Sequence, residues 1–299
     1  MQKNNAKAYF QLVSAMLIFG TIGIFRRNIL LSSGMLAFVR GVIGGLFLCL
    51  FRRFLTKKHP ETAKTEEKID RKNLFLLILT GAFIGINWIL LFESYSYTTV
   101  SVATMCYYMQ PTFVLLLSPI VLRERLTVRK LLCAAAAIFG MVLISGITEG
   151  AAGGAHDFTG ILLGLGAAVF YAAVILLNKK ITVQNAYRKT EIQLFSAAAA
   201  MIPYLLLTED FSAIRPTALS AALVLFVGIF HTGFAYALYF GSMTRLRAQS
   251  VAVLSYIDPV FALFLSALFL HEPLPPSGII GAILIIGSAV VSEISPAKN

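Results

Sequence analysis

An aspartate followed by a proline interrupts a long hydrophobic run of the sequence, residues 248–270. This run can cross a bilayer as a helix, since about 20 residues at about 1.5 Å each span roughly 30 Å of hydrocarbon. Asp258 thus places a carboxyl where an unpartnered charge is costly. It could carry a proton or act as the counter-ion of a substrate amine. The structural alternative is a carboxyl that bonds the backbone opened by a kink or pairs with a fixed cation.

Two prolines, Pro259 and Pro111, are expected to kink their helices. Proline lacks an N–H and crowds the carbonyl four residues back, so the carbonyls of Ser255 and Tyr107 should be freed. Inside a bilayer only protein, substrate or cavity water can satisfy them. We therefore expect both prolines to shape the helices, with substrate contact at the freed carbonyls as an alternative role.

These prolines belong to an internal repeat. The 19 positions that start at Tyr108 recur 148 residues later with 9 identities. Gln110 corresponds to Asp258, so one copy is neutral and the other acidic, and we expect both side chains to contribute to one binding region. Glu124 and Glu272 also correspond, and we expect them to cap tight turns at helix ends. Matched broken helices in inverted repeats are typical of secondary transporters.

Other polar and aromatic residues within apolar runs are candidates for the walls of a cavity. His231 lies midway along one run and could exchange protons near neutral pH, although a lone histidine is more often a hydrogen-bonded packing residue. Arg40 could attract a substrate carboxylate or pair with Asp258, and its long side chain could equally snorkel to the headgroups. Stacking, hydrogen bonding or simple packing would explain Asn87, Trp88, Tyr108, Tyr171, Tyr236 and Tyr256.

Composition places these residues in a membrane protein. The chain is 58% hydrophobic and 13% charged, which is about half the charged fraction of a soluble domain. Long uncharged runs recur from end to end and predict an all-α integral membrane protein with ten transmembrane helices. The expected spans are 8–26, 34–52, 73–93, 99–121, 129–147, 158–178, 191–208, 217–241, 248–270 and 276–294.

The distribution of Lys and Arg predicts the orientation. With the N-terminus inside, 21 of the 25 basic residues fall in inner segments, and only Arg26, Arg27 and Arg215 fall in outer ones. Since cytoplasmic loops carry the excess of basic residues, both termini should be cytoplasmic and the protein should lie in the cell membrane. Five helices per half is an odd number, so the second half should enter the membrane inverted relative to the first.

Several classes of function lack their signals. The net charge of +11 is spread between the apolar runs and not gathered in one patch, which argues against nucleic-acid binding. Cys49, Cys106 and Cys133 lie in apolar runs without metal-ligand spacing, so we expect no metal or other cofactor. H-E-x-x-H, G-x-S-x-G and P-loop motifs do not occur. An intramembrane enzyme or a non-transporting membrane subunit stays as the alternative, but neither explains matched kinks in inverted halves.

The repeated motifs resemble the EamA-type transporters of the drug/metabolite transporter superfamily. Gln110 and Asp258, each followed by proline, are followed about a dozen residues later by Leu-x-Glu-x-Leu. Phe19 with Gly20, and Arg40, fall where the patterns of that family place an aromatic–glycine pair and an arginine.

The resemblance covers nearly the whole chain as two units, residues 1–147 and 158–294, joined by residues 148–157. It implies ten helices in two inverted five-helix halves around a central cavity. It also implies a secondary transporter that works by alternating access, often as an exporter of amino acids, related metabolites or drugs, and not an enzyme. The expected partners are a small-molecule substrate, the lipid bilayer and protons coupled through Asp258, in a monomer or homodimer without nucleic acid.

Overall fold

The computed structural model describes residues 2–26, 28–58, 69–98, 100–144, 157–213, 215, 217–270 and 276–293. All regular secondary structure within these ranges is helical, so the all-α prediction is confirmed. Glu272 and residues 148–156 of the connecting segment lie outside the described residues.

Short helices follow one another end to end in several places. The helices of the first half are α1 (Gln2–Gly20), α2 (Ile22–Arg26), α3 (Ser33–Lys58), α5 (Arg71–Tyr97), α6 (Val100–Tyr107), α7 (Gln110–Leu122) and α8 (Val128–Ile144). Those of the second half are α9 (Asp157–Asn178), α10 (Ala186–Thr208), the 3-10 turn η2 (Phe211–Ala213), α11 (Ala218–Phe226), the π-helical segment η3 (Val227–Phe234), α12 (Ala235–Met243), α13 (Ala248–Leu254), α14 (Ile257–Leu270) and α15 (Pro276–Glu293). Asp70, Asn185 and Thr217 begin α5, α10 and α11 by accepting a backbone N–H three residues further on.

Eight helices or end-to-end helix runs in the described ranges are long and apolar enough to cross a membrane. They correspond to the expected spans one to four and six to nine. The other two expected spans fall on α8 and on α15, which are apolar but are described over too few residues to count as candidate spans. The count of ten spans therefore stays a prediction.

The prolines stand at helix starts. α6 ends at Tyr107 and α7 begins at Gln110, while α13 ends at Leu254 and α14 begins at Ile257. Pro111 and Pro259 therefore lie in the first turn of a new helix, where a missing N–H costs nothing. The sequence led us to expect a kink at each proline, and the regular α-helix is interrupted just before each of them while Met109 and Ser255 stay in the right-handed helical region.

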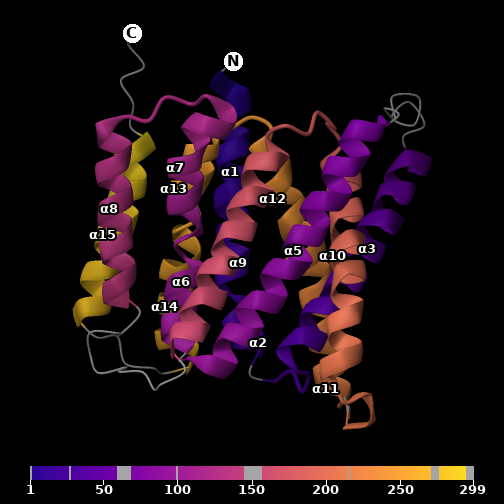
Figure 1. Cartoon of the computed structure of the whole chain (residues 1–299). Coiled ribbons are helices and arrows are strands. Elements are labelled where there is room, and N and C mark those ends of the chain that lie inside the picture. Colours follow the sequence, from indigo (N-terminus) through magenta and orange to yellow (C-terminus); the bar gives the residue numbers. More distant parts are fainter. Residues whose placement is uncertain are drawn as a thin grey trace.

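The helices pack in pairs with very close backbones. α8 packs along α15 at one edge of the molecule, and α10 packs on both α3 and α5 toward the other edge (Figure 1). A Cβ on Gly81 of α5 would lie 2.5 Å from the Gln193 carbonyl oxygen of α10, and one on Gly140 of α8 would lie 2.7 Å from the Gly281 carbonyl oxygen of α15. Small residues thus allow the close helix contacts on which membrane bundles depend.

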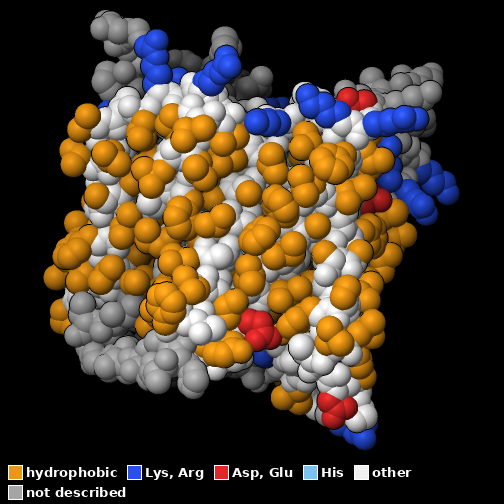
Figure 2. Space-filling view, viewed as in Figure 1, with side chains coloured by type: hydrophobic (Ala, Val, Ile, Leu, Met, Phe, Trp, Pro, Cys, Tyr) orange, Lys and Arg blue, Asp and Glu red, His pale blue; other side chains and the backbone are white. Residues whose placement is uncertain are grey.

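The surface divides into an apolar belt and one basic end. Hydrophobic side chains cover most of the face shown in Figure 2, and Lys and Arg gather along the edge where α1 begins and where the α7–α8, α9–α10 and α12–α13 connections lie. We call this edge the basic end and the opposite edge, with the α1–α2 junction and the start of α3, the far end. The apolar belt is the surface expected of a multi-pass membrane protein.

Candidate functional site

A cavity of about 600 Å³ lies where the helix breaks meet. Its walls come from both halves of the chain: α1, α2, α3, α5, α6, α7, α9, η3, α12 and α14. Of the residues singled out by sequence, the structure brings the following to its walls: Arg40, Trp88, Tyr108, Gln110, Tyr171, His231, Tyr236 and Asp258.

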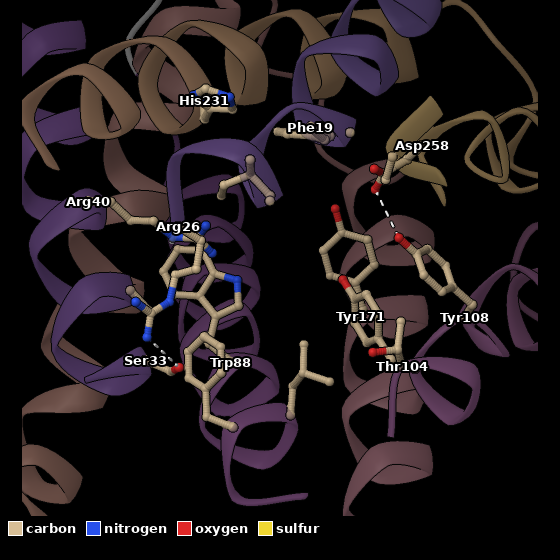
Figure 3. Close-up of a pocket in the computed structure, with 18 of the residues that line it drawn as sticks. Phe19, Arg26, Ser33, Arg40, Trp88, Thr104, Tyr108, Tyr171, His231 and Asp258 are labelled. Carbon is tan, nitrogen blue, oxygen red and sulfur yellow. Dashed lines mark hydrogen bonds between the residues drawn. The ribbon is translucent and has the colours of Figure 1, made fainter. Parts of the chain in front are cut away.

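Asp258 lies in the first turn of α14, beside the break that follows α13. The Tyr108 hydroxyl donates to its Oδ2 at 3.4 Å, and Tyr108 itself lies in the break between α6 and α7 (Figure 3). The matched breaks of the two halves are therefore joined by one polar contact. The helix dipole favours a carboxylate in the first turn of α14. Asp258 occupies that turn and lines the cavity.

Gln110, the repeat partner of Asp258, occupies the first turn of α7. It is 4% exposed, and its Oε1 has no hydrogen-bond partner among the described residues. A buried carbonyl oxygen without a donor is unusual in a folded protein. Gln110 thus offers the cavity a free acceptor and no charge.

Arg40 lies across the cavity from Asp258 (Figure 3). Its guanidinium carbon lies 4.7 Å above the centre of the Trp88 ring, and its Nε is buried without a hydrogen-bond partner in the described ranges. No ion pair joins Arg40 to Asp258 in this part of the chain. The side chain therefore faces the cavity as a cation held by ring stacking.

His231 belongs to η3, a stretch of π-helix of the kind often found at functional sites. Its Nε2 lies 2.7 Å from the Thr21 hydroxyl, which donates its hydrogen to the Ile18 carbonyl at 2.7 Å. The donor in this pair depends on the tautomer of the ring, and Nδ1 has no hydrogen-bond partner among the described residues.

Aromatic rings form most of the remaining wall. Tyr236 packs edge-on against Trp88, with ring centroids 6.3 Å apart, and against Phe19 at 5.1 Å. Tyr171 stacks on Tyr239 at 6.4 Å. Such rings can bind an apolar or cationic part of a ligand.

Two residues named from sequence lie away from the cavity. Asn87 is fully buried and donates from its side chain to the Ala167 carbonyl of α9 at 2.7 Å. Tyr256 is 1% exposed, and its hydroxyl lies 3.3 Å from that of Thr112. The structure gives both residues contacts between helices.

Sequence reasoning missed several polar residues. Arg26 of α2 lines the cavity toward the far end, where it donates to the carbonyls of Ile29 and Leu31 at 2.8 and 3.1 Å. Glu93 of α5 accepts a 2.5 Å hydrogen bond from Tyr204 of α10. Glu93 follows the same rule that identified Asp258, an ionisable residue in an apolar run, so that signal was present in the sequence.

The described residues hold no group of three or more His, Cys, Asp or Glu side chains placed to bind a metal ion. The cavity combines one acid, two arginines, free acceptors and aromatic faces around a volume suited to a small organic molecule.

The comparisons with known proteins agree with this architecture. A crystal structure of a protein superposes with a TM-score of 0.82 over 96% of this chain and 98% of that one, at 19% identity, which shows a shared fold. Curated relatives include the uncharacterized transporter YxxF of Bacillus subtilis, 31% identical over 89% of this chain and 83% of that protein, and Protein PecM of Dickeya dadantii, 24% identical over 74% of each. The model of the EamA-like transporter family matches residues 6–146 and 158–293. The chain is therefore a multi-pass membrane protein that belongs to the EamA-like transporter family.

Proposed function

We propose that the protein is a secondary transporter that moves a small organic solute by alternating access through the central cavity. The observation that carries the proposal is the cavity itself, built at the breaks of both halves and joined across them by Tyr108 and Asp258. Transporters commonly bind their solute where broken helices of two repeats meet. No such geometry is needed by a membrane subunit that only assembles with others.

Helix pairing supports ten membrane helices in two inverted halves, residues 1–147 and 158–294. α9 packs on α5 and on α7, while α1 packs on α12 and on α14. By the repeat, α1 corresponds to α9, α5 to α12 and α7 to α14. The pair α9–α5 therefore corresponds to the pair α1–α12, and the pair α9–α7 corresponds to the pair α1–α14. α8 with α15, and α3 with α10, are pairs of counterparts. A pseudo-twofold axis that passes through the cavity would produce this pattern.

The two charged walls indicate the class of solute. Arg40 with Trp88 suits a carboxylate, and Asp258 with Tyr108 suits an amine or a coupled proton. The aromatic rings between them suit an apolar body. We therefore favour amino acids, related metabolites or amine-containing drugs.

Proton coupling through Asp258 and export across the plasma membrane complete the proposal. An ionisable acid inside a bilayer is energetically costly and is usually functional, and proton relay is one of its common functions. The basic end would face the cytoplasm, since basic residues are retained on that side.

Purified full-length protein in liposomes tests the proposal. Amino acids, amines and quaternary ammonium compounds are offered at two pH values, with and without an imposed proton gradient. We expect saturable uptake of at least one class and a rate that the gradient changes. Uptake that saturates but ignores the gradient would remove the coupling role of Asp258, and no uptake of any class would overturn the transporter proposal.

A further inference from the structure

A short buried helix, α13, separates the cavity from the basic end. All of its seven residues, Ala248–Leu254, are buried, and Ser255 directly after it lines the cavity. The cavity wall extends the other way as far as Gly23, Arg26 and Ser33 at the far end, where Gly23 is exposed. A solute would therefore enter this conformation from the far end, and α13 blocks the basic end.

The start of α13 is capped from another helix. Its own N-cap residue, Arg247, makes no side-chain cap. Instead the two carboxylate oxygens of Glu124 accept from the backbone N–H groups of Ala248 at 3.0 Å and Gln249 at 3.4 Å. The first N–H groups of a helix need such acceptors, and a negative charge there is favoured by the helix dipole.

Glu124 is placed for this role by the end of α7. Arg123 ends α7 in the left-handed conformation, with φ 57°, and its N–H returns to the Ser118 carbonyl. The chain thereby turns sharply and presents Glu124 to α13. The sequence led us to expect Glu124 to cap a turn at its own helix end, whereas the structure shows it capping the start of α13.

A lysine also holds the connection that leads into α13. Nζ of Lys179, just after α9, donates to the carbonyls of Met243 at 2.8 Å and Leu246 at 2.6 Å. These carbonyls belong to the end of α12 and the loop that leads into α13. Burial lowers the pKa of Lys179, while the nearby Glu124 carboxylate acts in the opposite direction.

The helix end that carries Lys179 is firmly anchored. The Gln193 side chain of α10 donates to the Thr80 hydroxyl of α5 at 2.7 Å and to Oδ1 of Asn178 at 3.1 Å. Nζ of the fully buried Lys189 lies 3.4 Å from the Asn178 carbonyl, to which it donates. Lys179 therefore extends from a block of α5, α9 and α10 toward the α12–α13 loop.

We propose that Glu124 and Lys179 form a clasp that holds α13 in place and keeps the cavity closed at the basic end, and that release of this clasp opens the cavity to that side. The inference rests on the proposed alternating access. It goes beyond that proposal because it assigns the closing contacts to two residues outside the cavity.

Accessibility of a single cysteine tests the clasp without any solute. The reporter is Ser255→Cys in the full chain with Cys49, Cys106 and Cys133 replaced, reconstituted in vesicles. A membrane-impermeant maleimide is applied to one face at a time. We expect Glu124→Gln and Lys179→Met each to raise the labelling rate from the basic-end face by roughly tenfold, because each removes charge-assisted hydrogen bonds from the closed state only.

The matched control is Glu191→Gln. Glu191 pairs with Arg52 at 3.0 Å between α10 and α3 and does not bind the α12–α13 loop. This variant should leave labelling unchanged, and Lys179→Arg, which keeps the donors, should remain near the unmodified rate. Thermal unfolding in detergent identifies the folded variants, and either clasp variant alone is sufficient for the test.

Unchanged labelling from the basic-end face in a folded clasp variant would overturn the proposal, as would an equal rise in Glu191→Gln. The labelling result can be distinguished from the result of the transport assay. A rise in labelling without uptake of any solute supports the clasp and contradicts the transporter proposal. Uptake of a solute with unchanged labelling supports the transporter proposal and contradicts the clasp.

Discussion

Asp258 is the residue at which the proposed coupling can be tested most directly. Asp258→Asn keeps the size of the side chain and can still accept from Tyr108, but it cannot release a proton. We expect the stimulation of uptake by a proton gradient to disappear, with the protein still inserted and folded. The measurement is initial uptake with and without the gradient, and Gln110→Glu would serve as a companion that adds an acid at the repeat position. Unchanged gradient dependence in Asp258→Asn would contradict the coupling role.

Arg40 provides a second single-residue test, which concerns recognition of a carboxylate on the solute. Its planar guanidinium lies over Trp88 at 4.7 Å, and a lysine would keep the charge but not the flat stacking or the fork of donors. We expect Arg40→Lys to weaken the apparent affinity for a carboxylate-bearing solute by roughly 5- to 30-fold, given typical cation–π and charged hydrogen-bond energies. Competition between a solute and its decarboxylated analogue measures this effect. An equal loss of apparent affinity for both compounds would mean that Arg40 does not bind the carboxylate.

The limits of sequence reasoning are clear at individual residues. Asp258 and Arg40 were identifiable because a charge inside an apolar run needs a reason. Asn87 and Tyr256 were chosen by residue type, yet their side chains meet a carbonyl of α9 and the hydroxyl of Thr112. Those partners are distant in sequence, so only the packing of the helices identifies them. Thr21, the partner of His231, could not be found for the same reason.

At the level of helices, close backbone contact between α8 and α15 makes a prediction about stability. A Cβ on Gly281 would lie 2.5 Å from the Gly140 carbonyl oxygen, whereas one on Gly287 of the same helix would meet nothing within 4 Å. Gly281→Ala should therefore destabilise the protein by about 1–3 kcal/mol through overpacking. Gly287→Ala should be neutral or slightly stabilising, since alanine favours helix by about 1 kcal/mol over glycine.

Thermal unfolding of the two variants in the same detergent checks this contrast. The two substitutions add the same methyl group to the same helix, at a buried position and at an exposed one. Equal melting temperatures for Gly281→Ala and Gly287→Ala would mean that α8 and α15 do not approach as closely as the structure shows.

The positions of the two helix breaks were predictable from the sequence, but the packing around them was not. Pro111 and Pro259 located both breaks, because proline cannot continue the hydrogen-bond ladder of a helix. The sequence does not show which residues surround the breaks. Tyr108 and Tyr256 pack in one apolar cluster with residues of α8, α14 and α15, so this packing across the two halves is visible only in the structure.

For the molecule as a whole, the repeat and the apolar runs were sufficient to predict an all-α membrane protein of this family. Both are properties of the chain that need no tertiary contact to be seen. The cross-helix capping of α13 by Glu124 was not predictable, because a carboxylate after one helix and a bare N-terminus 124 residues later carry no shared signal. The same holds for the pairing of counterpart helices around the cavity.

Orientation in the membrane is the last prediction, and it decides what the clasp closes. Thr244, in the α12–α13 loop at the basic end, and Ser212, beyond α10 at the far end, are both exposed, and the span Ala218–Met243 separates them. Basic residues resist translocation across the membrane, so Thr244 should be cytoplasmic. In intact cells a membrane-impermeant maleimide should label Ser212→Cys and not Thr244→Cys in a chain without its native cysteines. Lysis should make the second site reactive and serves as the control. If the labelling is reversed, the basic end faces outward, the clasp becomes an external barrier, and a solute entering from the far end would be loaded from the cytoplasm.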